Sequence, residues 1–289
     1  MNTPSLNFIE AGNFTEEIHH NISDINEVMS SSLEIPLQDN DIKNNTSFDK
    51  LSGNISVKNV SFSYRDNSEL LFENLSFEIN FGESVAIVGR TGAGKSTLCK
   101  LLSGLYTPYS GEILYDDKKI VDINKSIFSG SVAVVNQDIV LFEDTIANNI
   151  KMYDKTIEDF EMILAARDAL IHDEVIEREN GYKYLMSEGG KDFSNGERQR
   201  FEIARVLSQD PTILILDEAT SNLDNITENK IITSILNRGV TTIIVSQKIS
   251  TVSKCDKILV LDNGKIIKIG KHQDLINSCE LYKNLVYEY

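Results

Sequence analysis

Residues 89–96 constrain this chain more than any other segment. They read GRTGAGKS and fit the pattern G-x-x-x-x-G-K-[ST]. The apolar run Ser84–Val88 before them predicts a buried strand, and residues 97–102 after them predict a helix with one apolar face. A glycine-rich turn in that position can curl so that its N–H groups point at phosphate oxygens, where the helix start adds positive partial charge. The sequence therefore predicts a phosphate-binding loop rather than an ordinary turn.

Two side chains of this loop have distinct expected roles. Lys95 is placed to reach the β- and γ-phosphates of a nucleotide, and the Ser96 hydroxyl is placed to ligate Mg²⁺. The expected nucleotide contacts are the loop and the residue that follows it: Gly89, Arg90, Thr91, Gly92, Ala93, Gly94, Lys95, Ser96 and Thr97.

The composition narrows the class of protein. The 289 residues carry 28 Lys and Arg against 44 Asp and Glu, which gives a formal net charge of −16. A general nucleic-acid binder, or a protein that binds an anionic membrane surface, would be basic, so we expect neither. Three sparse cysteines favour reduced thiols and a cytoplasmic setting. No apolar run is long enough for a transmembrane helix, and we expect no signal peptide.

Residues 1–52 form an acidic segment that differs from the rest of the chain. It holds nine Asp and Glu residues against two lysines. Apolar side chains recur in it at helical spacing and stop before Pro36, which predicts a helix followed by a flexible linker over residues 37–52. That helix could dock on its own domain, dock on a partner, or fray. Its apolar stripe comprises Ile18, Ile22, Ile25, Met29 and Leu33.

From residue 53 to residue 289 the pattern predicts one α/β domain. Apolar and polar residues alternate over 55–64 and 75–79, which predicts two antiparallel strands beside the main sheet. The run 213–216 is continuously apolar, as in a strand buried on both faces of a parallel sheet. A polar helical subdomain is expected at about 144–208. Further strands are expected at 111–115, 132–135, 241–245 and 257–261, a tight hairpin at 262–265, and helices at 196–207 and 275–289.

The helical subdomain contains two apolar stripes that predict buried helix faces. One comprises Ile157, Phe160, Ile163 and Leu164. The other comprises residues 169–171 with Val175 and Ile176. In the expected helix 196–207, Phe201, Ala204 and Leu207 are expected to face inward, with Arg198, Arg200 and Arg205 on the polar side.

An acidic pair follows the buried strand 213–216. Asp217 and Glu218 are expected at the carboxyl edge of the parallel sheet, where phosphates bind. Asp217 could hold Mg²⁺ directly or through water, and Glu218 could orient and deprotonate an attacking water. A capping role alone is the alternative, and the upstream phosphate loop favours the catalytic interpretation.

Residues 193–200 read FSNGERQR and resemble the signature motif of ATP-binding cassette (ABC) ATPases, whose usual form is Leu-Ser-Gly-Gly-Gln. The resemblance implies that Ser194, Asn195, Gly196 and Glu197 act on the ATP of a partner subunit. Asn, which replaces the first glycine, is the non-glycine residue that best tolerates left-handed backbone conformations. A carboxylate at Glu197 should weaken attraction for phosphate unless Arg198 or Arg200 offsets its charge.

Other residues match this family in the same order along the chain. The resemblance implies that Tyr64 stacks on adenine, that Gln137 touches the metal, and that residues 221–224 form the D-loop. The family normally has His at position 247, where this chain has Gln. Because Gln carries no titratable proton, Gln247 should support binding more readily than turnover. The implied catalytic residues are Glu218 and Gln247, and the implied metal ligands are Ser96, Gln137 and Asp217.

The resemblance, which covers residues 53–289, implies a P-loop NTPase core with a mainly parallel sheet, an antiparallel β-subdomain and an α-helical subdomain. It implies ATP and Mg²⁺ as cofactors and a dimer with a second cassette around ATP. The chain looks similar to exporters, and among them to bacterial peptide and bacteriocin exporters. The expected partner is a membrane-spanning domain or subunit, which places the chain at the cytoplasmic inner face of the cell membrane. The alternatives are a regulatory nucleotide-binding subunit with little turnover and a soluble cassette ATPase of another pathway.

Overall fold

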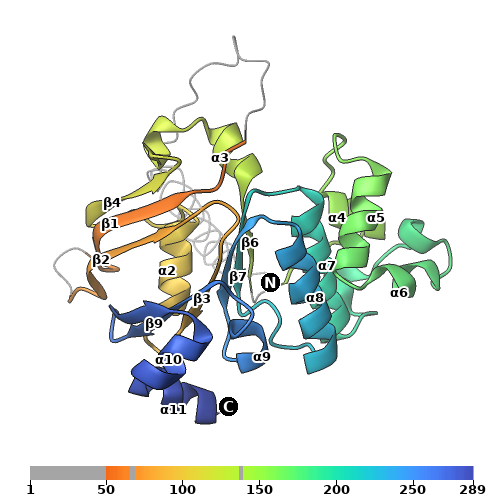
Figure 1. Ribbon diagram of the computed structural model, residues 1–289. Coiled ribbons are helices and arrows are strands. Elements are labelled where there is room, and N and C mark those ends of the chain that lie inside the picture. Colours follow the sequence, from red (N-terminus) through yellow and green to blue (C-terminus); the bar gives the residue numbers. More distant parts are fainter. Residues whose placement is uncertain (1–49, 66–68, 137–138, 289) are drawn as a thin grey trace, which may run out of the picture. The chain divides into compact units, whose positions relative to one another are not determined.

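The computed structural model describes residues 50–65, 69–136 and 139–288, which form two sheets and the helices around them (Figure 1). The helix and linker expected within residues 1–49 lie outside these described residues. Among the described helices, none is long and apolar enough to cross a membrane.

The smaller sheet is antiparallel and confirms the expected β-subdomain. Its strand order is β2-β1-β4-β5, with β1 paired to both β2 and β4. Alternating burial along β1 and β2 follows the alternating sequence, because successive side chains point to opposite faces of a strand. The strands are β1 (Ile55–Phe62), β2 (Phe72–Ile79), β4 (Ser110–Tyr115) and β5 (Lys118–Lys119).

The larger sheet has six strands in the order β10-β9-β3-β8-β7-β6. Five of them run parallel, and β10 returns antiparallel to β9. The expected hairpin joins β9 and β10 through Asn263 and Gly264, whose φ angles of 43° and 71° match the positive values that a type I′ turn requires. The strands are β3 (Ser84–Val88), β6 (Val132–Val135), β7 (Ile213–Asp217), β8 (Thr241–Val245), β9 (Lys257–Asp262) and β10 (Lys265–Gly270).

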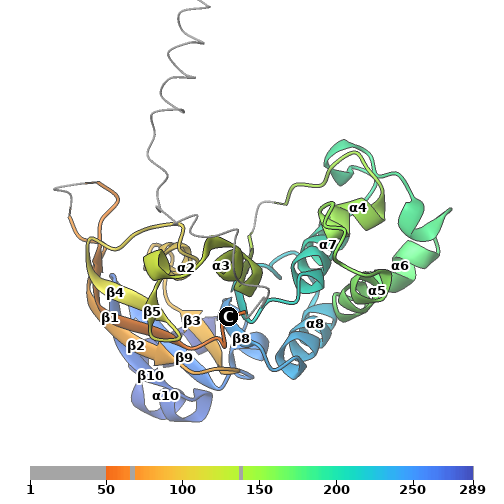
Figure 2. The same cartoon turned by 90° about the horizontal axis from the view of Figure 1, so that it is seen from above.

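The six-stranded sheet separates two hydrophobic cores. Along β7, Leu214 and Leu216 belong to one core, while Ile213 and Ile215 belong to the other. The same alternation holds in β3, β8 and β9, so both faces of the parallel sheet are buried. The first core includes the helical subdomain, and the second joins the sheet to the β-subdomain. Figures 1 and 2 show α2 (Lys95–Leu102) and α7 (Asn195–Ser208) on opposite sides of this sheet.

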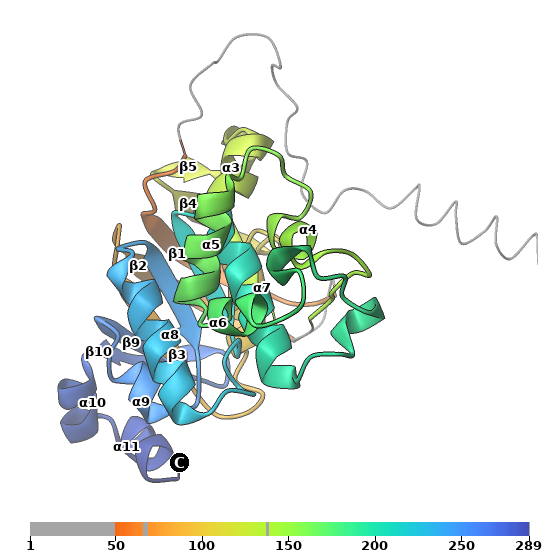
Figure 3. The same ribbon diagram turned by 90° about the vertical axis from the view of Figure 1, so that its right-hand side faces the viewer.

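Side-chain caps fix where several helices begin. The Asn124, Thr145, Ser194 and Asp224 side chains each accept a hydrogen bond from a backbone N–H of the first turn. Figure 3 shows the helical subdomain, with α5 beside α7. The remaining helices are α3 (Lys125–Ser131), α4 (Ile146–Lys151), α5 (Asp159–Asp168), α6 (His172–Ile176), α8 (Asn225–Asn237), α9 (Ile249–Val252), α10 (His272–Ser278) and α11 (Glu280–Glu288), with 3₁₀ turns η1 (Ile120–Asp122), η2 (Gly181–Lys183) and η3 (Glu188–Gly190).

The structure corrects one predicted helix face. Ile157 is buried and Ile163 packs against the core as predicted, but Phe160 and Leu164 are 62% and 51% exposed. The buried side chains of α5 are Met162, Ala165 and Ala166. The helix begins after Glu158, so Ile157 precedes it, and the small alanines let α5 pack closely on α7. The expected C-terminal helix is also two helices, divided at Cys279, whose backbone is extended.

Arg205 is likewise buried rather than on the polar side of α7. It donates hydrogen bonds from Nε to the Asn149 carbonyl at 2.8 Å and from Nη1 to the Val140 carbonyl at 3.0 Å. Its Nη1 also lies 2.6 Å from the Glu202 carboxylate. A buried guanidinium therefore donates to a carbonyl of α4 and to one of the segment before it.

Candidate functional site

The phosphate loop connects β3 to α2 as the sequence predicts. Gly94 caps the helix in the left-handed region with φ of 99°, and Gly92 has φ of 82°. A Cβ added at Gly94 would lie 2.8 Å from ring atoms of Phe72, so both the backbone angle and the space require glycine there. Arg90 and Thr91 are exposed at the loop, and Ala93 is buried beneath it.

Lys95 lies within its own loop. Its Nζ donates to the Gly89 carbonyl at 2.9 Å and to the Arg90 carbonyl at 3.0 Å, and the residue is 7% exposed. Burial lowers the pKa of Lys95, while the nearby Glu218 and Asp217 carboxylates oppose that shift. The ammonium is therefore already removed from bulk water at the place where phosphate is expected.

The structure brings two of the expected metal ligands together. The Ser96 hydroxyl donates to Asp217 Oδ1 at 3.0 Å, across the end of β7. Burial raises the pKa of Asp217, and Glu218 adds to the rise, while the hydrogen bond from Ser96 opposes it. Hydroxyl and carboxylate oxygens are ligands that Mg²⁺ takes, with phosphate oxygens and water completing its shell, so these residues fit the metal. Gln137, the third expected ligand, lies outside the described residues.

Glu218 follows β7 with an unusual backbone. Its φ is 51°, in the left-handed region that non-glycine residues rarely adopt, and its N–H donates to the Val245 carbonyl at 3.1 Å. Gln247 Nε2 donates to Glu218 Oε1 at 3.4 Å. The two expected catalytic side chains are therefore adjacent, and Gln247 orients the carboxylate by a hydrogen bond.

Tyr64 lies in a cluster of three aromatic side chains. Its ring meets Phe62 edge-on at 5.3 Å and Tyr106 edge-on at 5.8 Å, centroid to centroid. Its hydroxyl shares a hydrogen bond with Thr97 on α2, and the residue remains 59% exposed. The strand expected to run to residue 64 ends at Phe62, so Tyr64 stands beyond it as an exposed ring next to the phosphate loop.

The signature residues begin α7, in the helical subdomain. Ser194 and Glu197 form a capping box: the Ser194 N–H and hydroxyl donate to Glu197 Oε2 at 2.8 and 2.6 Å, and the Glu197 N–H donates to Ser194 Oγ at 3.2 Å. Ser194 and Asn195 are exposed. Asn195 Oδ1 accepts a hydrogen bond from Arg198.

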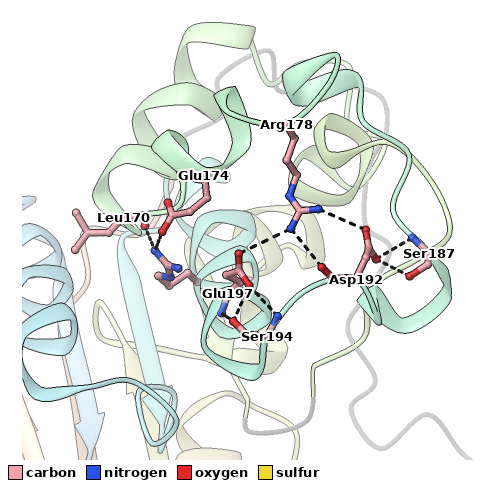
Figure 4. A network of polar contacts seen from close by, with 8 residues as sticks. Leu170, Glu174, Arg178, Ser187, Asp192, Ser194 and Glu197 are labelled. Carbon is pink, nitrogen blue, oxygen red and sulfur yellow. Dashed lines mark hydrogen bonds and ion pairs between the residues drawn. The ribbon is translucent and has the colours of Figure 1, made fainter.

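One cation beside Glu197 is a residue that the sequence interpretation missed. Arg178 Nη2 lies 3.9 Å from Glu197 Oε1 (Figure 4). Of the two arginines expected to offset Glu197, Arg200 pairs with Glu174 at 2.6 Å and its charge also lowers the pKa of Glu197, whereas Arg198 Nη1 donates to the Gly189 carbonyl. Arg178 follows α6 in a polar stretch without a motif, so no sequence signal pointed to it.

The signature and the phosphate loop are not brought together within this chain. Helix α2 packs into the core shared with the β-subdomain, and α7 packs into the core on the other face of the sheet. The signature helix instead contacts the predicted D-loop, where the Asn222 N–H donates to Gln199 Oε1 at 3.1 Å. A site that needs both motifs therefore requires a second chain.

Comparison with known proteins agrees with this geometry. The ABC transporter family matches residues 72–221. An ABC transporter ATP-binding protein of Bacillus subtilis (strain 168), YfiB, named as uncharacterized, is 40% identical over 83% of this chain. A Staphylococcus aureus protein provisionally named a multidrug export ATP-binding/permease protein is 38% identical over 86% of it. The chain spans 42% and 44% of the length of these two relatives.

A solved structure of an ABC exporter also resembles this chain. A bacterial Atm1-family ABC exporter with ATP bound superposes with a TM-score of 0.82 at 33% identity, over 94% of this chain and 47% of that one. Because the family match covers more than half of the sequence, the chain belongs to the ABC transporter family, as an ATP-binding domain homologous to those of exporters.

Proposed function

We propose that this chain binds and hydrolyses ATP as the cassette of an ABC exporter. The observation that carries the proposal is the carboxyl edge of the parallel sheet, where Lys95 and Ser96 at the start of α2 meet Asp217 and Glu218 at the end of β7. One cation, a metal-ligating pair and a general base at one edge match the requirements of phosphoryl transfer.

Each of these residues has a definite task in the proposed reaction. Lys95 exchanges its two loop carbonyls for β- and γ-phosphate oxygens when ATP enters. Ser96 and Asp217 would hold Mg²⁺, which would supply positive charge beside the phosphates. Glu218 accepts a proton from the attacking water, and Gln247 holds its carboxylate in place.

Hydrolysis in the proposed function also involves a partner cassette, and transport involves a membrane part. The exposed Ser194 and Asn195 are at the start of α7, and α7 lies on the opposite side of the sheet from α2 (Figure 2). This arrangement supports ATP-driven dimerisation with the two motifs facing across subunits. The relatives with joined ATP-binding and permease functions support coupling to a membrane domain at the cytoplasmic face. The class of cargo remains a prediction, with peptides expected from the sequence.

Turnover by purified protein tests the proposal. We expect Mg-ATP hydrolysis in the wild type, loss of nucleotide affinity in Lys95→Ala, and retained affinity without turnover in Glu218→Gln. Gln247→His should match or exceed the wild-type rate. A wild-type rate as low as that of Glu218→Gln would instead support the regulatory alternative, and equal Mg-ATP affinity in wild type and Lys95→Ala would refute the nucleotide site.

A further inference from the structure

Arg178 contacts the signature segment at several points. Its Nη2 donates to the Asp192 carbonyl at 3.3 Å, and its Nη1 lies 4.0 Å from Asp192 Oδ2. That carboxylate oxygen is buried and has no hydrogen-bond partner among the described residues, while Oδ1 accepts from the Ser187 N–H and hydroxyl. The guanidinium is thus the cation that faces the buried oxygen of Asp192 (Figure 4).

The same guanidinium also stacks on aromatic rings. Its central carbon lies 3.9 Å from the ring centroid of Phe193 and 5.1 Å from that of Tyr184. Phe193 is 6% exposed and directly precedes Ser194. A planar cation can stack on a ring face and donate hydrogen bonds from its edge at the same time, which an ammonium cannot.

On its remaining side Arg178 faces Glu197, where the chain departs from the usual signature. Glu197 Oε1 lies toward Arg178, and Oε2 accepts both hydrogen bonds from Ser194. Burial raises the pKa of Glu197, but the Ser194 hydrogen bonds and the charges of Arg178 and Arg200 outweigh it and leave the pKa below its ordinary value. Glu197 is therefore an anion beside the surface that is expected to meet phosphate.

We propose that Arg178 is a positioning residue for the signature motif: it fixes the segment 192–197 and neutralises Glu197, so that Ser194 can approach the nucleotide of a partner subunit. This inference rests on the proposed function. It explains how a carboxylate can occupy a position that faces an anion, because the Arg178 guanidinium, which also faces Asp192, offsets the charge of Glu197. It also implies that the Ser194 hydroxyl must break its hydrogen bond to Glu197 Oε2 before it can donate to phosphate.

The test compares Arg178→Leu, Arg178→Lys, Glu197→Gln and the double variant Arg178→Leu/Glu197→Gln with wild type. Arg238→Leu is the matched control, since Arg238 pairs with Asp168 at 2.7 Å, is similarly exposed, and does not touch the signature segment. The first measurement is amide hydrogen exchange of residues 192–197. The second is the ATP concentration that gives half-maximal turnover. This value is compared with the nucleotide affinity of each variant, measured after Glu218→Gln has been combined with it to prevent hydrolysis.

We expect Arg178→Leu to accelerate exchange over residues 192–197 about tenfold, and Arg178→Lys to do so less, because lysine keeps the charge and loses the stacking. We expect half-maximal turnover to need roughly fivefold to tenfold more ATP in Arg178→Leu, with intrinsic nucleotide affinity unchanged. In the Glu197→Gln background, Arg178→Leu should raise the ATP concentration for half-maximal turnover by less than about threefold, because position 197 then has no carboxylate to neutralise.

Two results would overturn the inference. One is exchange over residues 192–197 that is the same in Arg178→Leu and Arg238→Leu. The other is an equal shift of half-maximal turnover by Arg178→Leu in the wild-type and Glu197→Gln backgrounds, which would mean that charge neutralisation plays no part. Failure of the proposed function is distinct from both, since it would appear as absent wild-type turnover, and the exchange measurement would still decide the role of Arg178.

Discussion

Glu228 Oε2 lies 2.7 Å from Lys248 Nζ, and the Glu228 side chain is completely buried while that of Lys248 is 30% exposed. Glu228 Oε1 accepts hydrogen bonds from Thr220 and Thr251 at 2.8 and 2.7 Å. Lys248 also donates to the Leu223 carbonyl at 2.8 Å. One ion pair therefore joins the segment after Glu218 to the segment after Gln247, next to both expected catalytic residues.

Glu228→Gln should lower the free energy of unfolding by about 2 kcal/mol, because the amide cannot replace the charge that Lys248 faces. Urea unfolding at neutral pH measures this. The control is Glu73→Gln, which removes an exposed pair with Lys265 and should change stability by less than about 0.5 kcal/mol. Equal losses in the two variants would show that burial of the Glu228 pair contributes nothing.

Glu218→Asn should stabilise the fold by about 1 kcal/mol while turnover is lost. Asn tolerates the left-handed backbone at position 218, where the φ of 51° disfavours Glu. Thermal unfolding and ATP hydrolysis measure the two effects. Glu218→Gln is the matched control, since it also removes the base but keeps a side chain that disfavours this backbone. If Glu218→Gln stabilises as much as Glu218→Asn, charge rather than backbone strain is the cause.

Tyr64→Ala should weaken ATP binding about tenfold, which corresponds to about 1.4 kcal/mol of stacking on the base. Tyr64→Phe should keep the ring and lose only the hydrogen bond to Thr97, so its affinity should stay within about threefold of wild type. Titration with a fluorescent ATP analogue distinguishes the two variants. An equal loss in both would assign the effect to the hydroxyl and contradict stacking.

Asp256 gives a prediction for the pH dependence of stability. The Ser84 hydroxyl donates to Asp256 Oδ2 at 2.6 Å, and this bond is the largest cause that lowers the pKa of Asp256 below its ordinary value of 3.8. Because the folded-state pKa is depressed, the stabilisation is present above pH 3.8 and is lost as the pH falls through the folded-state pKa.

Asp256→Asn should therefore lower the free energy of unfolding by about 1–2 kcal/mol at pH 7 and by much less at about pH 2.5. Urea unfolding of wild type and variant at the two pH values measures the difference. A loss that stays the same at both values would mean that the carboxylate charge is not what stabilises the contact with Ser84.

The sequence predicted the strands well because their signals are local. Continuous burial in β7 and the two-residue hairpin at Asn263 and Gly264 follow from a few adjacent residues. On the predicted face of α5, Phe160 and Leu164 were wrong, because the small residues Ala165 and Ala166 pack against α7 in their place. Large apolar residues at helical spacing do not by themselves show which face of a helix is buried.

The candidate site also has parts that could be predicted from the sequence and parts that could not. The phosphate loop and the Asp217–Glu218 pair are contiguous motifs, so their approach at one sheet edge could be predicted. Arg178 and Arg205 could not, since each binds backbone or carboxylate groups far along the chain, and an isolated arginine carries no spacing signal. The role of Gln137 stays a prediction, because it lies outside the described residues.

The alternation of Ile213 and Ile215 with Leu214 and Leu216 assigns neighbouring residues of one strand to different cores. The six-stranded sheet thus separates the two cores. The helical layer on one face can open locally as a cooperative unit while the core on the phosphate-loop face keeps its packing. Substitutions one position apart in β7 should then disturb different contacts. A cavity at Leu214 would weaken packing against the signature helix α7, whereas a cavity at Ile215 would weaken packing beneath the phosphate loop. In the proposed function, support for the nucleotide site and packing against the signature helix would therefore depend on alternate residues of a single strand.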